Sequence, residues 1–269
     1  MNIAVITGAS SGIGEEFAKQ IDHLRGLDEI WLLARRKNCL DALAQTLTHK
    51  VRVFPADLTQ PKELRKFYKA LVKSKAQIKI LVNAAGCGKI GYFESLSIED
   101  HLDVIEINCK ALVGFTYLCL PFVHKGIIYQ LASVAAFIPQ PNFSIYAASK
   151  AFVLSFSRAL NQELRERNVR VVAVCPNPVE TEFFEKAGDE CQASAIKKIG
   201  VEKVEKVVAT ALKKRKGDLS LSCFWSKAIY ITSKMIPHRF ILPIEKRLLT
   251  TNHCPIEKKL SMDRRASLI

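Results

Sequence analysis

Tyr146 and Lys150 stand four residues apart in an apolar stretch of the chain that begins at Ser144. On a helix this spacing places both side chains on one face, with their Cβ atoms about 5 to 6 Å apart. A phenol has an unperturbed pKa of about 10, and an ammonium group beside it favours the phenolate. The pair therefore suits proton transfer near pH 7, although the same spacing occurs by chance in many helices. A catalytic interpretation depends on partners elsewhere in the chain.

The elements that would position this pair alternate regularly along the sequence. Continuous apolar runs, typical of strands buried on both faces, lie at 3–6, 29–33, 51–54, 78–82, 126–131 and 169–174. Segments of helical period separate them, at 12–25, 37–47, 60–75, 97–124 and 146–167. This alternation predicts an α/β fold with a doubly wound parallel sheet, a Rossmann-type three-layer α/β/α arrangement in a single domain.

The domain is expected to span residues 1–222, ending in a helix at 201–215 and an edge strand at 218–222. Residues 223–250 carry apolar and aromatic side chains among lysines and arginines, and they predict a helical extension packed on the substrate cleft. An amphipathic element on a membrane surface is the alternative for this segment. Residues 251–269 are polar and charged and predict a disordered tail.

The charge of the chain is concentrated near its C-terminus. The formal net charge is +14, and residues 196–269 hold 17 Lys and Arg against 6 Asp and Glu. Such an excess could attract nucleic acid or an anionic membrane, but the lysines lack the regular aromatic interleaving of a single-strand binder. We expect no nucleic-acid partner, and we consider membrane contact the less favoured of the two roles for the extension.

The eight cysteines are scattered, without a Cys-x-x-Cys pair or zinc-like spacing to histidine. This pattern favours reduced thiols and predicts no metal site. We expect neither a signal peptide nor an apolar run long enough to span a bilayer, and therefore a cytoplasmic location.

A glycine-rich turn follows the first predicted strand directly. Gly8, Gly12 and Gly14 allow a tight turn, a close approach of backbone to a phosphate and close packing of helix on strand. The pyrophosphate of a dinucleotide would then lie at the positive N-terminus of the first helix.

Arg35 and Arg36 end the second strand, where no acid is present. A carboxylate there would bind the ribose hydroxyls of NAD, whereas arginine accommodates the 2′-phosphate of NADP, so we predict NADP(H). The alternative is that both arginines cap a surface turn. Asp57, after the third strand, could accept from the adenine amino group or act as a helix N-cap, and both roles stay open. Ser133 ends the fifth strand, at the edge where such sheets bind ligands.

Together these residues resemble the short-chain dehydrogenase/reductase family. The motifs occur in the family's order over about residues 1–222: Thr7-Gly8-x-x-x-Gly12-x-Gly14, Asn83-Ala84-Ala85-Gly86, Asn108, Ser133, Tyr146-x-x-x-Lys150 and Pro176-Asn177-Pro178-Val179-x-Thr181. The resemblance implies a seven-stranded parallel sheet, a nicotinamide cofactor and the catalytic set Asn108, Ser133, Tyr146 and Lys150. The residues expected to bind the cofactor are Gly8, Ser10, Ser11, Gly12, Ile13, Gly14, Arg35, Arg36, Asp57, Leu58, Asn83, Ala84, Gly86, Tyr146, Lys150, Pro176, Val179 and Thr181.

The resemblance also implies roles for the catalytic set. Tyr146 would deliver a proton to the developing alkoxide, and Ser133 would hydrogen-bond the same oxygen. Lys150 would lower the pKa of Tyr146 and hold the nicotinamide ribose. Asn108 would fix a water that links Lys150 to solvent. Asn177 stands where the family usually has glycine, and we expect the turn to survive because asparagine tolerates a left-handed backbone.

The segments expected to line the substrate cleft are nearly all apolar: 87–93, 134–143, 183–184 and the C-terminal extension. They predict that the substrate is a hydrophobic ketone or secondary alcohol, such as a steroid, a 3-oxoacyl compound or an aromatic carbonyl. Separately, we expect the enzyme to form a homodimer or homotetramer. A non-catalytic NADPH-binding regulator and a membrane-surface protein are the alternative functions.

Overall fold

The computed structural model describes residues 1–188, 201–214 and 216–243. Seven strands form one sheet in the order β3-β2-β1-β4-β5-β6-β7, and every neighbouring pair is parallel. The strands are β1 (Asn2–Thr7), β2 (Glu29–Ala34), β3 (Lys50–Pro55), β4 (Gln77–Asn83), β5 (Val123–Leu131), β6 (Arg170–Val174) and β7 (Leu219–Ser220). The strand order reverses between β1 and β4, which is where such sheets bind ligands. The predicted Rossmann-type fold is confirmed.

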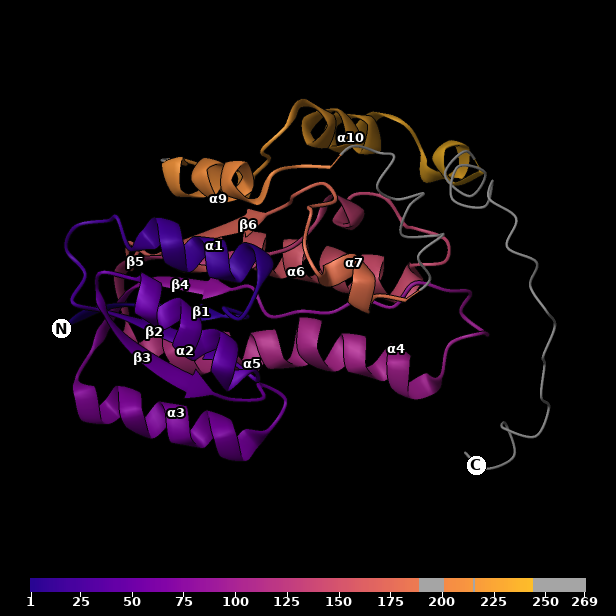
Figure 1. The fold of residues 1–269 in the computed structure, drawn as a ribbon. Coiled ribbons are helices and arrows are strands. Elements are labelled where there is room, and N and C mark those ends of the chain that lie inside the picture. Colours follow the sequence, from indigo (N-terminus) through magenta and orange to yellow (C-terminus); the bar gives the residue numbers. More distant parts are fainter. Residues whose placement is uncertain (189–200, 215, 244–269) are drawn as a thin grey trace.

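Helices cover both faces of the sheet and give the three-layer arrangement (Figure 1). One face packs against α1 (Gly12–Ile21), α2 (Lys37–Thr46) and α9 (Val204–Lys213). The other face packs against α3 (Pro61–Ser74), α5 (Leu112–Cys119) and α6 (Ser144–Glu163). Successive residues of β1 alternate between the two cores, as the pleat of a strand requires. Burial on both faces explains why the strands are continuously apolar.

A long helix carries the middle of the chain past the site. It consists of α4 (Ile98–Ile105), the π-helical turn η1 (Glu106–Ala111), α5 and the 3₁₀ turn η2 (Leu120–Phe122). In the described part of the chain it is the one helix long and apolar enough to cross a membrane, with a mean hydropathy of 1.3. Ala111, Phe115 and Cys119 pack in the core against the sheet, so we read it as a core helix.

The C-terminal part contains α7 (Phe183–Lys186), α9, β7 and α10 (Phe224–Met235), followed by a helical stretch at 238–243. α10 begins where the extension was predicted to begin. Its Ile229 and Tyr230 pack on the 3₁₀ turn η3 (Val134–Ala136) and the residues after it, with the rings of Tyr230 and Phe137 5.1 Å apart. The remainder of the predicted extension, 244–250, and the predicted tail, 251–269, lie outside the described residues.

Candidate active site

The glycine turn after β1 has the geometry of a phosphate cradle. Gly8 and Gly12 have φ values of 67° and 58°, in the left-handed region that favours glycine. A Cβ on Gly8 would lie 2.7 Å from the backbone nitrogen of Ala85, and one on Gly14 would overlap the carbonyl of Gly8. Ser11 is the N-cap of α1, and in the described residues its side chain makes no capping hydrogen bond. The first N–H groups of α1 are thus available to an anion, and the turn fits a dinucleotide pyrophosphate.

Thr7 ties this turn to the end of β4. Its Oγ1 accepts hydrogen bonds from the N–H groups of Ala84 (3.1 Å) and Ala85 (3.2 Å) and donates to the carbonyl of Val82 (3.3 Å). Ala84 and Gly86 therefore form the small-residue edge expected beside a cofactor.

The side chain of Asn83 points elsewhere, into the core. Its Nδ2 donates to Thr116 Oγ1 at 2.9 Å and to Gln130 Oε1 at 3.0 Å. Asn83 is 3% exposed and joins β4 to β5 and α5, so only its backbone faces the predicted cofactor site.

Asn108 lies in the π-helical turn and clamps the loop that follows β4. Its Oδ1 accepts from the N–H of Cys87 at 2.9 Å, and its Nδ2 donates to the carbonyl of Cys87 and to Ser149 Oγ, both at 2.9 Å. A Cβ on Gly86 would lie 2.9 Å from Asn108 Oδ1 and 3.5 Å from Lys150 Nζ. Both amide hydrogens of Asn108 bind protein groups, so its side chain is not disposed to hold the predicted water. A link to Lys150 would have to use its backbone carbonyl.

Tyr146, Lys150 and Ser133 meet at the start of α6 and the end of β5. Tyr146 and Lys150 are 9% and 6% exposed, and the side chains of Tyr146 and Ser133 are hydrogen-bonded. Lys150 Nζ donates to the carbonyl of Leu131 at 2.8 Å and lies 5.5 Å from the centroid of the Tyr146 ring. The structure therefore brings all four predicted catalytic residues together.

Burial controls the ionisation of Tyr146 and Lys150. It lowers the pKa of Lys150 to about 8, because a buried ammonium group loses its hydration. Burial also raises the pKa of Tyr146 well above its usual value, and the hydrogen bond with Ser133 opposes this only in part. Burial outweighs any opposing effect of Lys150, whose Nζ is hydrogen-bonded to the carbonyl of Leu131, so the predicted lowering of the tyrosine pKa by Lys150 stays a prediction. A protonated phenol at pH 7 nevertheless suits proton donation.

Two aromatic rings pack against Tyr146. Phe143 stacks on its ring at 4.2 Å between centroids, and Phe183 lies 5.4 Å away. A Cβ on Gly88 would lie 2.8 Å from Phe143 and 2.9 Å from Phe183, so the loop after β4 touches both rings. Three of the segments predicted to line the cleft, 87–93, 134–143 and 183–184, thus meet at Tyr146, whereas the contacts of the C-terminal extension are with the 3₁₀ turn η3 and the residues after it.

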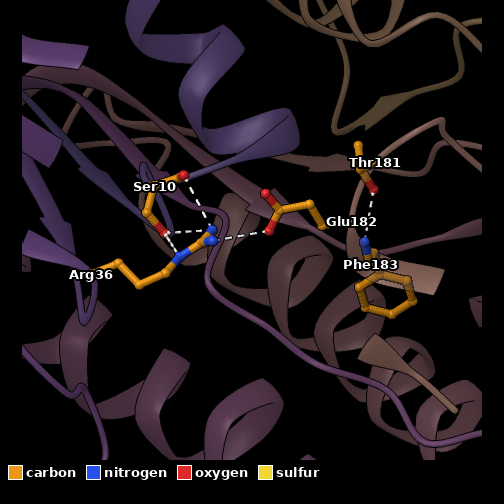
Figure 2. Close-up of polar contacts among 5 residues, drawn as sticks. All are labelled: Ser10, Arg36, Thr181, Glu182 and Phe183. Carbon is orange, nitrogen blue, oxygen red and sulfur yellow. Dashed lines mark hydrogen bonds and ion pairs between the residues drawn. The ribbon is translucent and has the colours of Figure 1, made fainter. Parts of the chain in front are cut away.

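Arg36 reaches across the predicted cofactor site (Figure 2). Its Nη2 donates to the carbonyl oxygen of Ser10 at 3.2 Å and its Nε to Ser10 Oγ at 3.4 Å, while Nη1 forms an ion pair with Glu182 at 3.0 Å. Thr181, next to Glu182, lies against the glycine turn, since a Cβ on Gly12 would be 3.0 Å from its Cγ2. Arg36 is thus aimed at the turn, whereas Arg35 is exposed.

Asp57 shapes the loop between β3 and α3. Its Oδ1 accepts from the N–H of Thr59 at 2.9 Å and from Thr59 Oγ1 at 2.7 Å, and its own N–H donates to the Glu63 carboxylate. The N-cap of α3 is Gln60, so the predicted capping role of Asp57 is wrong in its position and the residue forms an Asx turn instead. Leu58 is buried, and the adenine contact stays a prediction.

Residues 2–192 match the family model described as short chain dehydrogenase. The chain belongs to this family. A relative from Thermotoga maritima, a 3-oxoacyl-[acyl-carrier-protein] reductase, is 31% identical over 73% of this chain and 82% of its own. A short-chain dehydrogenase from Sphingobium yanoikuyae in complex with NADPH is 32% identical with a TM-score of 0.75, covering 87% of this chain and 93% of its own. A 3-ketoacyl-(acyl-carrier-protein) reductase from Brucella melitensis complexed with NADH is 25% identical with a TM-score of 0.71, covering 82% and 95%.

This short-chain dehydrogenase is accordingly an oxidoreductase of alcohol or carbonyl groups with a nicotinamide dinucleotide as its cofactor. Of the two solved relatives, the one from Sphingobium yanoikuyae holds NADPH and the one from Brucella melitensis holds NADH.

Asn177 is where this dehydrogenase departs from the family pattern. In the described residues, the non-glycine positions with a positive φ are Lys75, Lys125, Asn142 and Asn168. The prediction of a left-handed backbone at Asn177 is therefore wrong. Its N–H donates to Glu202 Oε1 at 2.9 Å and its Nδ2 to Cys223 Sγ at 3.4 Å. The side chain thereby ties the Pro176–Thr181 turn to the N-cap of α10.

Three residues near the site of this dehydrogenase were given no role from the sequence. Thr7 is the first residue of the glycine motif, and Glu182 is an acid next to Thr181, so both positions carried a signal. Ser149 Oγ accepts a hydrogen bond from Asn108 Nδ2 and donates one to the carbonyl of Tyr146 at 2.7 Å. Apart from its place in α6, nothing in the sequence indicates this role.

Proposed function

We propose that this chain interconverts a ketone and a secondary alcohol on a hydrophobic substrate with NADP(H), and that Tyr146 is the general acid/base. The observation that carries the proposal is the buried cluster in which Tyr146 bonds Ser133 and Lys150 lies beside the tyrosine ring. This cluster stands at the carboxyl edge of the sheet, next to the switch point between β1 and β4.

The chain supplies proton transfer and positioning for this reaction. When bound, the nicotinamide supplies the hydride for the carbonyl carbon. Tyr146 donates its proton to the carbonyl oxygen, and Ser133 hydrogen-bonds the same oxygen. With a pKa of about 8, Lys150 is mostly protonated at pH 7, and its charge stabilises the phenolate left by proton donation.

Each part of the cofactor has an expected holder. The pyrophosphate would lie on the turn from Ser10 to Gly14, beside the open N-terminus of α1. Ala84 and Gly86 would border the riboses, and Lys150 would bind the nicotinamide ribose. Pro176, Val179 and Thr181 would contact the carboxamide, while Asp57 and Leu58 would contact the adenine.

The preference for NADP(H) rests on the end of β2. Arg35 and Arg36 follow this strand in place of an acid, and the guanidinium of Arg36 is already held at Ser10. A 2′-phosphate would replace Glu182 as the anionic partner of Arg36.

The hydrophobic substrate class is supported by the rings of Phe143 and Phe183 beside Tyr146. A steroid, a 3-oxoacyl compound or an aromatic ketone would suit these walls, since each carries an apolar body next to its carbonyl.

The test is a panel of ketones, steroids and 3-oxoacyl thioesters scored by loss of NADPH absorbance, with the Tyr146→Phe variant alongside. We expect turnover by the natural chain, and loss of at least about 10²-fold in Tyr146→Phe with NADPH affinity unchanged. Near-native turnover by the variant would contradict the role of Tyr146. NADPH binding without turnover on any substrate would favour the non-catalytic regulator.

We further propose a cytoplasmic homodimer or homotetramer. Exposed apolar side chains along α4, α5 and the adjoining α6 support a second copy on this face: Leu102, Ile105, Tyr117 and Phe152.

A further inference from the structure

α10 carries apolar side chains on both of its sides, since Ile229 and Tyr230 pack on the domain while other large apolar residues point outward. Its inward side carries Ser226, which is fully buried, and Tyr230, which packs on Phe137. Its outward side carries Phe224, Ile231 and Met235, which are 76%, 54% and 77% exposed. These three residues are spaced by seven and four, so they form one apolar stripe along the helix.

Further apolar side chains extend the stripe. Trp225 is 60% exposed beside Phe224, and Phe240 is 55% exposed in the helical stretch after α10. Figure 1 places α10 and this stretch on the outside of the molecule, on the opposite side from α3. A soluble chain rarely exposes so many large apolar residues together unless the surface has a partner.

The charges around the stripe are all of one sign. Residues 219–243 contain three basic residues and no Asp or Glu. Lys227 and Lys234 are exposed and, being seven residues apart, lie together along one flank of the stripe. The guanidinium of Arg239 lies 4.7 Å from the centroid of the Phe240 ring.

We propose that this surface docks on an anionic lipid bilayer, with α10 lying in the plane of the membrane. The apolar stripe would enter the boundary between headgroups and acyl chains, where tryptophan is favoured. Lys227, Lys234 and Arg239 would lie at the level of the anionic headgroups, which attract them.

A second copy of this chain fits the same surface less well. A two-fold contact sets each patch against itself, so the basic flank of one copy would face the basic flank of the other. No acid in residues 219–243 would offset that repulsion. A lipid surface supplies both the apolar phase and the opposite charge.

An apolar cavity of about 360 Å³ lies beside the helical stretch at 238–243 that follows α10. His238 and Leu242 form one wall, and Ala135 and Ala147, which also belong to the apolar cluster around Tyr146, form part of the other. A surface docked on lipid would hold this cavity next to a source of hydrophobic molecules. The docking itself does not depend on the proposed reaction.

Co-sedimentation of the full chain with vesicles tests the docking. The probes are vesicles of phosphatidylcholine alone and of phosphatidylcholine with about one third phosphatidylglycerol. We expect binding to the anionic vesicles that weakens from about 0.1 M to about 1 M salt, and little binding to the neutral ones. Failure of the natural chain to bind anionic vesicles would overturn the proposal.

Tryptophan fluorescence gives a second readout on the same samples. The chain has two tryptophans, of which Trp31 is fully buried in the core and Trp225 is exposed. Entry of Trp225 into the bilayer should shift the emission to shorter wavelength, and Trp225→Phe should remove the shift while binding persists. Binding without any shift would mean that the lipid contacts another surface, which overturns the assignment to α10.

Matched variants distinguish binding through α10 from a non-specific effect of net charge or hydrophobicity. Lys227→Glu with Lys234→Glu should weaken vesicle binding at least roughly tenfold, whereas Lys66→Glu with Lys73→Glu, equally spaced on α3, should change it little. Ile231→Gln should also weaken binding, whereas Val72→Gln, on α3 and 50% exposed, should not. Equal losses in both sets, or an effect of Ile231→Gln on oligomeric mass alone, would overturn the proposal. Turnover of a soluble substrate should be unchanged in all four variants, which keeps this test separate from that of the catalytic function.

Discussion

The ammonium group of Lys150 is buried and therefore poorly hydrated. Burial brings the pKa of this ammonium group to about 8. The ammonium group therefore persists below pH 8 and is lost above it. Burial raises the pKa of Tyr146, so the phenol keeps its proton through the same range.

We predict that kcat/KM for ketone reduction falls above about pH 8, by roughly tenfold per unit once Lys150 is neutral. Lys150→Arg should move this limb to higher pH, because a guanidinium stays charged. The shape of the pH profile is the readout, since the absolute rate of the variant will also fall. An unshifted limb in Lys150→Arg would assign the titration to another group.

Glu182 competes for the side chain that we assign to the 2′-phosphate. Its carboxylate lies 3.0 Å from Arg36, and the two side chains are 45% and 38% exposed, so the pair contributes little to stability.

Glu182→Gln should tighten NADPH roughly two- to fivefold and change NADH binding less, since only NADPH brings a phosphate to Arg36. Titration of cofactor fluorescence measures both affinities. Glu180→Gln, an exposed position two residues earlier, is the matched control and should leave the NADPH/NADH ratio unchanged. Loss of NADPH affinity in Glu182→Gln would show that Glu182 helps to hold the cofactor.

At the scale of elements, Asp22 joins the end of α1 to the start of β3. Its carboxylate accepts from the N–H groups of Thr48 and His49, both at 2.8 Å, and lies 2.9 Å from His49 Nδ1. Burial opposes its ionisation, but these hydrogen bonds prevail and bring its pKa to about 2 from the ordinary 3.8. A depressed carboxyl pKa adds stability above pH 3.8, and this contribution is lost as the pH falls through 2.

Asp22→Asn should therefore lower the free energy of unfolding at pH 7 by about 2 kcal/mol and flatten its dependence on pH between about 4 and 2. Urea unfolding at several pH values measures both effects. Asp41→Asn, which removes an exposed pair with Lys37, should cost less than about 0.5 kcal/mol. Similar losses in the two variants would contradict the special role of Asp22.

At the scale of the whole molecule, the sheet could be predicted from the sequence. The side-chain contacts between distant segments at the site could not. Continuous apolar runs such as that of β1 follow from burial on both faces, so the strands could be read directly. The ion pair of Arg36 and Glu182 joins residues 146 positions apart, and it depends on how the segment after β6 crosses the glycine turn. Similarly, the inward turn of Asn83 depends on Thr116 and Gln130 from other elements.

Assembly is the other property that belongs to the whole molecule. Tyr117 is 79% exposed on α5, within the face proposed for a second copy. Tyr117→Glu should lower the mass measured by light scattering after gel filtration, because a second copy would have to bury the new charge. Arg65→Glu, exposed on α3, is the control and should keep the mass of the natural chain. An unchanged mass for Tyr117→Glu would place the interface elsewhere.

The hydrogen bond from Asn177 to Cys223 has a thermodynamic consequence. One of its partners stands in the turn expected to hold the nicotinamide carboxamide, and the other begins the helix expected to lie on lipid. If lipid favours one arrangement of this bond and thereby strengthens cofactor binding by some factor, the cofactor must strengthen lipid binding by the same factor. Replacing Asn177 with glycine would cut this link, so the two affinities, measured each in the presence of the other ligand, should become independent.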